Sequence, residues 1–253
     1  MDKIKLSILV RTLVLALSQE NAFAALPYGL YVDAGIGGQN SNFKHSASQT
    51  INIPTVTSFA ANENLTQYSN NFIAGLGIGY SQKLAPQFVM AIEGTANWDN
   101  TDVSTTVTAN NGTVGLNNKI ETKLKNDFAI LLKPGLLLDR NTLVYGMIGP
   151  RWGNVETIYN ANFTTTTAVF NPIFRNSTYK LGVTAGLGIQ RDIDCHLSLA
   201  AEYAYTYYGN LPVPGNASLP ILVAGTQVGT ATNNSEARGF TNSLMLKLIY
   251  QII

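Results

Sequence analysis

The stretch that decides the fold covers residues 179–208 and reads YKLGVTAGLGIQRDIDCHLSLAAEYAYTYY. Apolar residues alternate with small, polar or charged residues on both sides of a central turn, and this period of two is typical of β-strands. Each half has about ten residues or slightly more, which is enough for a tilted strand to cross a bilayer. The apolar positions are Tyr179, Leu181, Val183, Ala185, Leu187 and Ile189 before the turn and Leu197, Leu199, Ala201, Tyr203, Tyr205 and Tyr207 after it.

The opposite face of this hairpin carries small and charged residues, including Lys180 and Glu202. An apolar face that ends in tyrosines, backed by a polar face, is typical of a strand with lipid outside and a packed polar interior. A soluble barrel of the lipocalin type would show the inverse polarity, with apolar residues inside. We therefore predict a transmembrane hairpin, and the rest of the chain repeats its pattern.

The composition favours a membrane β-barrel over a soluble domain or a helical membrane protein. Charged residues make up 12% of the 253-residue chain, against about 25% in ordinary soluble domains. Mean hydropathy is only +0.08, and no internal run approaches the roughly 18 to 20 apolar residues of a spanning helix. The net charge is +1 and no basic cluster occurs, so nucleic acid is not an expected partner.

The single cysteine, Cys195, excludes an internal disulfide and a cysteine-based zinc site. It stands beside His196, which would point the opposite way along a strand. We therefore interpret Cys195 as an incidental thiol, and we expect neither a metal nor a cofactor.

The first 24 residues are typical of a secretory signal peptide. Lys3 and Lys5 form a basic start, residues 6–17 form an apolar core, and Ala22-Phe23-Ala24 fits a cleavage site. We predict a signal peptide at 1–24 and one barrel domain at 25–253.

Eight segments fit the alternating pattern, which makes the predicted fold all-β. Because their number is even, both ends of the domain should lie on the periplasmic side. The predicted strands are 29–39, 72–81, 88–99, 127–139, 143–153, the two halves of the opening hairpin, and 240–252.

The connections between these strands alternate in length. Those at 84–87, 139–141 and 192–195 are short, whereas the other four have roughly twenty to thirty residues each, which is rare in a compact domain. Outer-membrane barrels combine short periplasmic turns with long extracellular loops. The predicted fold class is an eight-stranded antiparallel up-and-down transmembrane β-barrel with four long extracellular loops and short periplasmic turns.

Seven charged residues share the inner phase of the predicted strands. On the lipid face a charge near the midplane would cost about 2 to 4 kcal/mol, whereas the interior of an eight-stranded barrel is just wide enough to be filled by side chains. Buried charges must pair, so we predict a network that plugs the barrel and fixes strand register; a gated ion path is the alternative. Its members are Asp33, Glu93, Lys133, Arg151, Lys180, Glu202 and Lys247.

Three stretches carry a resemblance to a known family: YVDAGIG at 31–37, GLGI at 186–189 and LSLAAEYAY at 197–205. With the strand pattern, they resemble the opacity-protein and OmpA-type outer-membrane barrels of Gram-negative bacteria. The resemblance implies a bacterial outer-membrane location, contact with outer-membrane lipid and lipopolysaccharide, and insertion by the barrel-assembly machinery. That machinery reads a terminal Phe in such barrels; here Ile252 ends the apolar series and Ile253 follows.

The resemblance and the loops together favour a surface protein with no enzymatic activity. Such a protein supports the outer membrane, or acts as an adhesin or surface antigen whose loops contact a host-cell or surface ligand. A small gated channel is one alternative. An outer-membrane hydrolase such as a lipid A deacylase is a weaker one, because a hydrolase needs a nucleophile beside a base. His45 in the first long loop and His196 at a periplasmic turn are both away from the outer halves of the strands, so we assign no catalytic residue.

Overall fold

The computed structural model describes residues 28–53, 57–110, 114–160, 162–165, 169–170, 173–211, 217–223 and 226–252. The predicted signal peptide at 1–24 and the predicted start of the domain at 25 lie outside these residues. Within the described ranges, no helix has the length and apolar character needed to cross a membrane.

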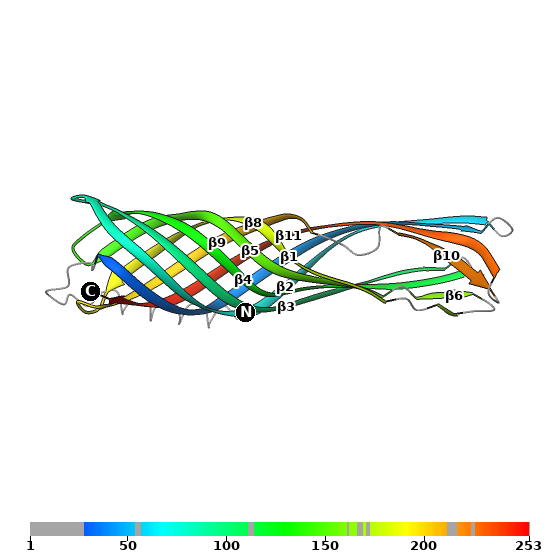
Figure 1. Ribbon diagram of the computed structural model, residues 1–253, viewed down its shortest axis with the longest axis horizontal. Coiled ribbons are helices and arrows are strands. Elements are labelled where there is room, and N and C mark those ends of the chain that lie inside the picture. Colours follow the sequence, from blue (N-terminus) through cyan, green and yellow to red (C-terminus); the bar gives the residue numbers. More distant parts are fainter. Residues whose placement is uncertain are drawn as a thin grey trace, which may run out of the picture.

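Eight long antiparallel strands close into a barrel (Figure 1). They are neighbours in the order β3-β2-β1-β11-β9-β8-β5-β4, and the pairing of β3 with β4 closes the circle. The first and last strands pair from Leu30 and Ile252 onward. These pairings confirm the predicted fold class. The strands are β1 (Gly29–Ile53), β2 (Thr57–Ala85), β3 (Phe88–Asn110), β4 (Val114–Leu137), β5 (Thr142–Asn160), β8 (Ile173–Asp192), β9 (Leu197–Leu211) and β11 (Thr226–Ile252).

Three short strands lie within the connections on the extracellular side. β6 (Phe163–Thr165) pairs with β4 and with β7 (Val169–Phe170), and β10 (Ala217–Val223) pairs with β11. At the opposite end, the turns between β2 and β3, β4 and β5, and β8 and β9 are short, as predicted.

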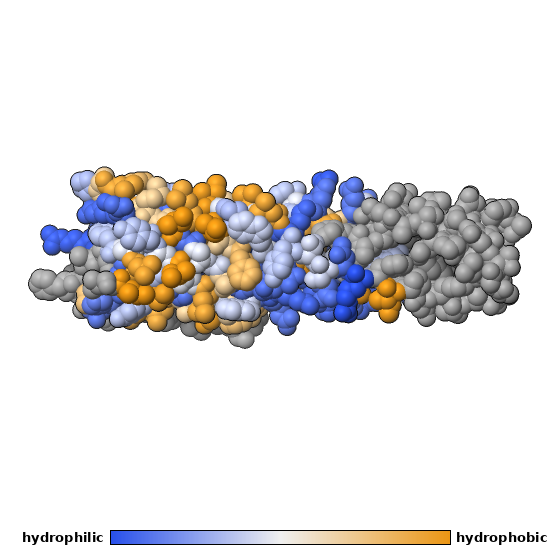
Figure 2. Space-filling view, in the orientation of Figure 1, coloured by the Kyte–Doolittle hydropathy of each residue, from blue (hydrophilic) through white to orange (hydrophobic). Residues whose placement is uncertain are grey.

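The barrel wall has the predicted polarity. Outward side chains such as Ile36 and Leu187 are 58% and 67% exposed, whereas inward Thr184 and Glu93 are 0% and 1% exposed. Figure 2 shows apolar side chains gathered over the barrel. A hydrophilic zone lies beside them, on the side toward which the strands continue in Figure 1. In a membrane the apolar band faces the hydrocarbon, because lipid-facing and lumen-facing residues alternate along each strand.

The four long connections differ from the predicted loops, because the strands continue through most of them. β1 has 25 residues and β2 has 29, whereas about 9 to 11 are enough to cross a bilayer. Pairing between β2 and β3 stops at Ile73 and Asp99, and pairing between β8 and β9 stops at Val183 and Tyr207. Beyond these pairs the strands form what we call the extracellular extension.

The extracellular extension consists of two sheets. One contains β2, β1, β11 and β10, and the other contains β3, β4, β5 and β8. Figure 1 shows them as two arms that leave the barrel together and separate toward the far end. A buried apolar cluster packs between strands of both arms where the extension begins. This outer cluster comprises Phe43, Val103, Leu124, Val155, Tyr208, Leu211 and Ala237.

Candidate functional site

Four of the predicted interior charges form a closed ring inside the barrel. Lys133 Nζ contacts Glu93 Oε2 and lies 2.6 Å from Glu202 Oε1. Lys247 Nζ lies 2.8 Å from Glu93 Oε1 and 3.2 Å from Glu202 Oε2. Each residue comes from a different strand, and the two signs alternate. We call these four residues the charge ring; because each charge touches two of opposite sign, the ring offsets much of the cost of burying ions.

Asp33 joins the charge ring at its edge. Its Oδ1 lies 3.2 Å from Lys247 Nζ, but neither carboxylate oxygen has a hydrogen-bond partner among the described residues. With Asp33 the group holds three carboxylates and two ammonium groups. Asp33 is therefore the least satisfied member.

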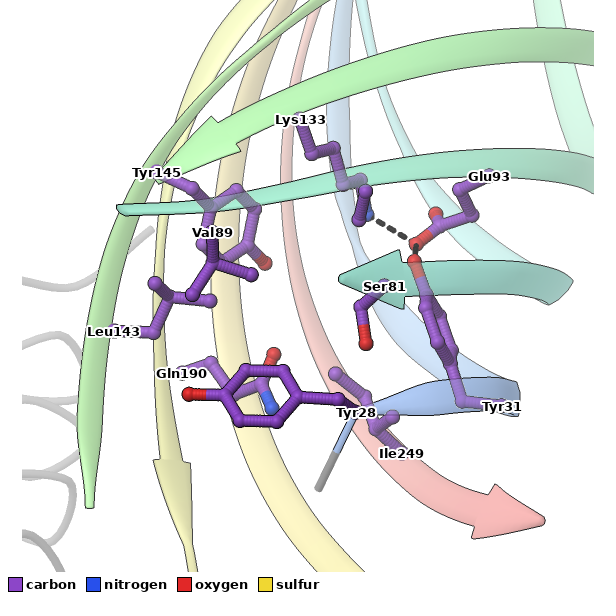
Figure 3. A pocket seen from close by; sticks show the side chains of 11 residues that line it. Tyr28, Tyr31, Ser81, Val89, Glu93, Lys133, Leu143, Tyr145, Gln190 and Ile249 are labelled. Carbon is purple, nitrogen blue, oxygen red and sulfur yellow. Dashed lines mark hydrogen bonds and ion pairs between the residues drawn. The ribbon is translucent and has the colours of Figure 1, made fainter. Parts of the chain in front are cut away.

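Two buried tyrosines complete the hydrogen bonding of the charge ring. Tyr31 donates its hydroxyl to Glu93 Oε2 at 2.8 Å, and Tyr145 donates to Glu202 Oε1 at 2.7 Å. Figure 3 shows Tyr31 and Lys133 both pointing to Glu93. Each phenol lies over a glycine on the next strand, Gly79 or Gly188, where an added Cβ would come within 2.4 Å of the tyrosine ring. Glycine is needed at both positions because the rings occupy the space of a side chain.

Arg151 and Lys180, the other two predicted members, lie apart from the charge ring. Arg151 Nη1 lies 3.2 Å from Asp127 Oδ2, and Asn97 donates to Asp127 Oδ1 at 2.7 Å. Lys180 lies at the start of the extracellular extension, is half-buried, and forms no ion pair with a residue that the structure describes. Asp127 was absent from the predicted set, although its place next to outward Phe128 gives it the inward phase.

Asp99 is a second buried carboxylate that the predicted set left out. It accepts hydrogen bonds from Thr101 at 2.8 Å and from the Gln39 amide. It also ends a predicted strand in the inward phase. Alternation alone could have identified both aspartates, because every second residue of these strands faces the lumen.

Two small cavities flank the charge ring. The one on the side of the periplasmic turns has a volume of about 30 Å³ and is lined by residues that include Tyr28, Ser81 and Gln190 (Figure 3). The other has a volume of about 10 Å³ and lies between the ring and Arg151. Spaces of this size hold one or two water molecules. Glu93 and Lys133 of the charge ring line the first cavity, and Glu202 and Lys247 line the second.

The periplasmic turn differs from the prediction for Cys195 and His196. The two side chains meet, with Cys195 Sγ 2.9 Å from His196 Nδ1, because the turn does not keep the alternation of a strand. The hydrogen bond between the Cys195 thiol and the Asp194 carboxylate raises the pKa of Cys195. A raised pKa disfavours the thiolate, which is the nucleophilic form.

His45 also lies elsewhere than predicted. It belongs to the outer part of β1 rather than to a loop, and its side chain is buried on the inner face of the extension. Both ring nitrogens lack a hydrogen-bond partner among the described residues. Burial lowers the pKa of His45, since the charged imidazolium loses its hydration.

Charges on the outside of the second sheet are paired. Glu156 Oε2 lies 2.7 Å from Lys125 Nζ, and Glu156 Oε1 lies 3.2 Å from Arg175 Nε. The hydrogen bond from Lys125 lowers the pKa of Glu156. Lys123 Nζ lies 3.0 Å from Asp102 Oδ2. Lys123, Lys125 and Arg175 therefore have carboxylate partners.

A closed eight-stranded barrel with an apolar exterior and a charged interior defines an integral outer-membrane protein of Gram-negative bacteria. The family model described as outer membrane protein beta-barrel domain matches residues 9–239, and the chain belongs to this family. The predicted family and the outer-membrane location are thereby confirmed.

The chain is similar to outer-membrane proteins of known name. The 31 kDa outer-membrane immunogenic proteins of Brucella melitensis and Brucella suis are each 26% identical to this chain over 187 residues, which cover 72% of this chain and 71% of the relative. Among solved structures, the outer membrane protease OmpT of Escherichia coli is 10% identical with a TM-score of 0.45, covering 92% of this chain and 99% of its own. OprG of Pseudomonas aeruginosa is 12% identical with a TM-score of 0.39, covering 89% and 97%.

Proposed function

We propose that this outer-membrane protein is a surface adhesin or antigen that contacts ligands outside the cell through its extracellular extension. The observation that carries the proposal is the length of the strands, which continue far beyond the apolar band. β1 and β2 stay paired from Gly29 and Ser81 to Ile53 and Thr57. Strands that only crossed the membrane would end near the level of Phe72, so the additional pairing builds a surface rather than an anchor.

The shape of the extracellular extension supports a binding role. In the barrel, β2 and β3 pair with each other up to Ile73 and Asp99. Beyond these residues, the same edges of the two strands have no backbone pairing partner among the described residues. Unpaired strand edges can accept an extended peptide as an added strand. The relatives named as immunogenic outer-membrane proteins also accord with exposure at the surface.

Trimming the β1–β2 hairpin tests this proposal. Ser46 and Asn64 are register partners, so residues 47–63 can be replaced by a two-residue Asn-Gly turn, which suits a hairpin. Cells that display the trimmed chain should lose adhesion to host cells and to immobilised matrix proteins.

As a control, β3 and β4 are trimmed in the same way between the register partners Ser104 and Glu121. This second trimming is made once with the β1–β2 hairpin intact and once together with the trimmed β1–β2 hairpin. A compact band that shifts on boiling in outer-membrane fractions verifies insertion of each variant. Wild-type adhesion by the doubly trimmed, inserted protein would contradict the proposal.

A small gated channel is a second candidate, favoured by the two cavities on either side of the charge ring. Weakening the ring with Glu202→Gln should then give more ohmic conductance in planar bilayers than the wild-type protein gives. The Glu156→Gln variant, altered outside the lumen, serves as the control. Equally silent bilayers for all three proteins would count against a channel.

A further inference from the structure

Two basic side chains oppose each other on the outer surface of the first and last strands. Lys44 of β1 is the register partner of Arg238 of β11. Both are exposed, whereas Phe43, His45 and Ala237 next to them face inward and are buried. Directly opposed residues of an antiparallel pair lie on the same face with their Cβ atoms about 4.5 to 5.5 Å apart. The two cations therefore share one small patch of surface.

No ion pair with a described residue balances the charge of this patch. Like charges placed directly opposite each other destabilise a sheet. Arg238 Nε donates to the Asn210 side-chain oxygen at 3.2 Å, which orients the guanidinium without balancing its charge. Glu236 lies two residues away on the same face, but no ion pair joins it to Lys44 or Arg238. The matching basic residues across the barrel, Lys125 and Arg175, both contact Glu156.

The patch lies just outside the apolar band. One outward position closer to the membrane, Phe240 packs its ring 5.7 Å from the ring of Tyr205, and exposed Tyr68 and Phe72 of β2 belong to the same zone. Aromatic girdles of this kind mark the border between the hydrocarbon and the headgroups. Lys44 and Arg238 are about 7 Å farther along the strand, which is the height of headgroup phosphates and sugars.

We propose that Lys44 and Arg238 bind a phosphate of an outer-leaflet glycolipid, the lipid A part of lipopolysaccharide. A phosphate between the two cations removes their repulsion and accepts charge-assisted hydrogen bonds from both. Thr66, opposite Lys44 on β2, and Asn210, opposite Arg238 on β9, supply a hydroxyl and an amide for the adjoining sugar. This site belongs to the barrel rim and does not depend on a ligand of the extracellular extension.

The test measures lipid A binding by the full chain in nanodiscs of zwitterionic lipid. Bis-phosphorylated lipid A is titrated against the wild-type protein, the two single variants Lys44→Gln and Arg238→Gln, and the double variant. A basic residue at a membrane surface contributes about fivefold in affinity. We expect each single variant to bind about fivefold more weakly and the double variant about thirtyfold more weakly.

The matched control is the double variant Lys125→Gln and Arg175→Gln, which removes the same charge from the opposite side. Its affinity should stay within about twofold of wild type. Equal weakening in both double variants would overturn the proposal, since it would mean general surface electrostatics. Unchanged binding by the Lys44 and Arg238 double variant would also overturn it.

Two further arms identify the ligand. Dephosphorylated lipid A should bind all proteins as weakly as the double variant binds the phosphorylated form. If inorganic phosphate displaces lipid A at equal concentration, the site takes free phosphate and the lipid assignment is wrong. The boiling-dependent gel shift verifies that each variant is folded, and the trimmed protein that lacks residues 47–63 should retain lipid A binding even if adhesion is lost.

Discussion

At the scale of single residues, Glu93 is the most deeply buried member of the charge ring. It accepts contacts from Lys133, Lys247 and the Tyr31 hydroxyl and is 1% exposed. Removing one partner of a buried ion pair costs about 3 to 5 kcal/mol, because the remaining charge is left uncompensated. We expect Glu93→Gln to lower the free energy of unfolding by that amount, measured by reversible urea unfolding in lipid vesicles.

Asp33→Asn is the comparison for this prediction. Asp33 is as deeply placed in the lumen, but it makes one 3.2 Å ion pair and no hydrogen bond with the described residues. Its removal also reduces the excess of carboxylates over ammonium groups. The loss of stability should therefore be clearly smaller than for Glu93→Gln. A loss as large in Asp33→Asn would show that the contacts of the charge ring are not what determines the cost.

At the scale of elements, alternation located the strands that lie in the membrane and failed for their continuations. In β8 and β9 every second residue is apolar, because one face meets lipid and the other meets the lumen. Residues 40–53 of β1 read NSNFKHSASQTINI and show no such contrast, since water replaces lipid on the outer face. Their strand conformation comes from pairing with β2 and β11, partners that a single segment does not reveal.

The inner phase placed the charges on the correct face but did not determine which of them meet. Glu93 and Lys247 are 154 positions apart in the chain, and their contact depends on the stagger of several strands around the barrel. The same stagger directs Arg151 to Asp127 rather than to the charge ring. At the turn, Cys195 contacts His196 because alternation ends where the strand ends.

The outer part of β1 carries a prediction about pH. His45 is buried between the sheets, and burial lowers its pKa, whereas in an unfolded segment its pKa is about 6.5. As pH falls below that value, the opened segment binds a proton that the packed segment does not, so the packed state loses stability. On intact cells, we expect protease to cleave the extracellular extension faster as the pH is lowered from 7 to 5.

The His45→Phe variant should remove most of this pH dependence, because phenylalanine fills a similar space without binding a proton. Glu156 should not contribute to this pH dependence. Because its pKa is lowered, the stability that its ion pairs contribute is lost only at pH values below the range of the test. If His45→Phe and wild type show the same increase in cleavage, the imidazole is not the responsible group.

At the scale of the whole molecule, one position in the bilayer accounts for several independent features. Outward Leu132 lies between its register partners Ile92 and Ile148, and all three are exposed, which places them within the hydrocarbon. The aromatic zone lies toward the extracellular side of this apolar band, and the opposed Lys44 and Arg238 lie just beyond the aromatic zone. The sequence of layers along the barrel therefore follows the sequence of layers across an outer leaflet.

This position predicts a depth-dependent cost for an outward arginine. Leu132→Arg should lower the free energy of unfolding in vesicles by about 2 to 4 kcal/mol, whereas Ser104→Arg, outward on the extension, should change it by less than about 0.5 kcal/mol. In detergent micelles, which adapt to the charge, the difference between the two variants should shrink. An equal cost at both positions in vesicles would mean that the apolar band does not face hydrocarbon, and the depth assigned to the aromatic zone and to the lysine–arginine pair would then be wrong as well.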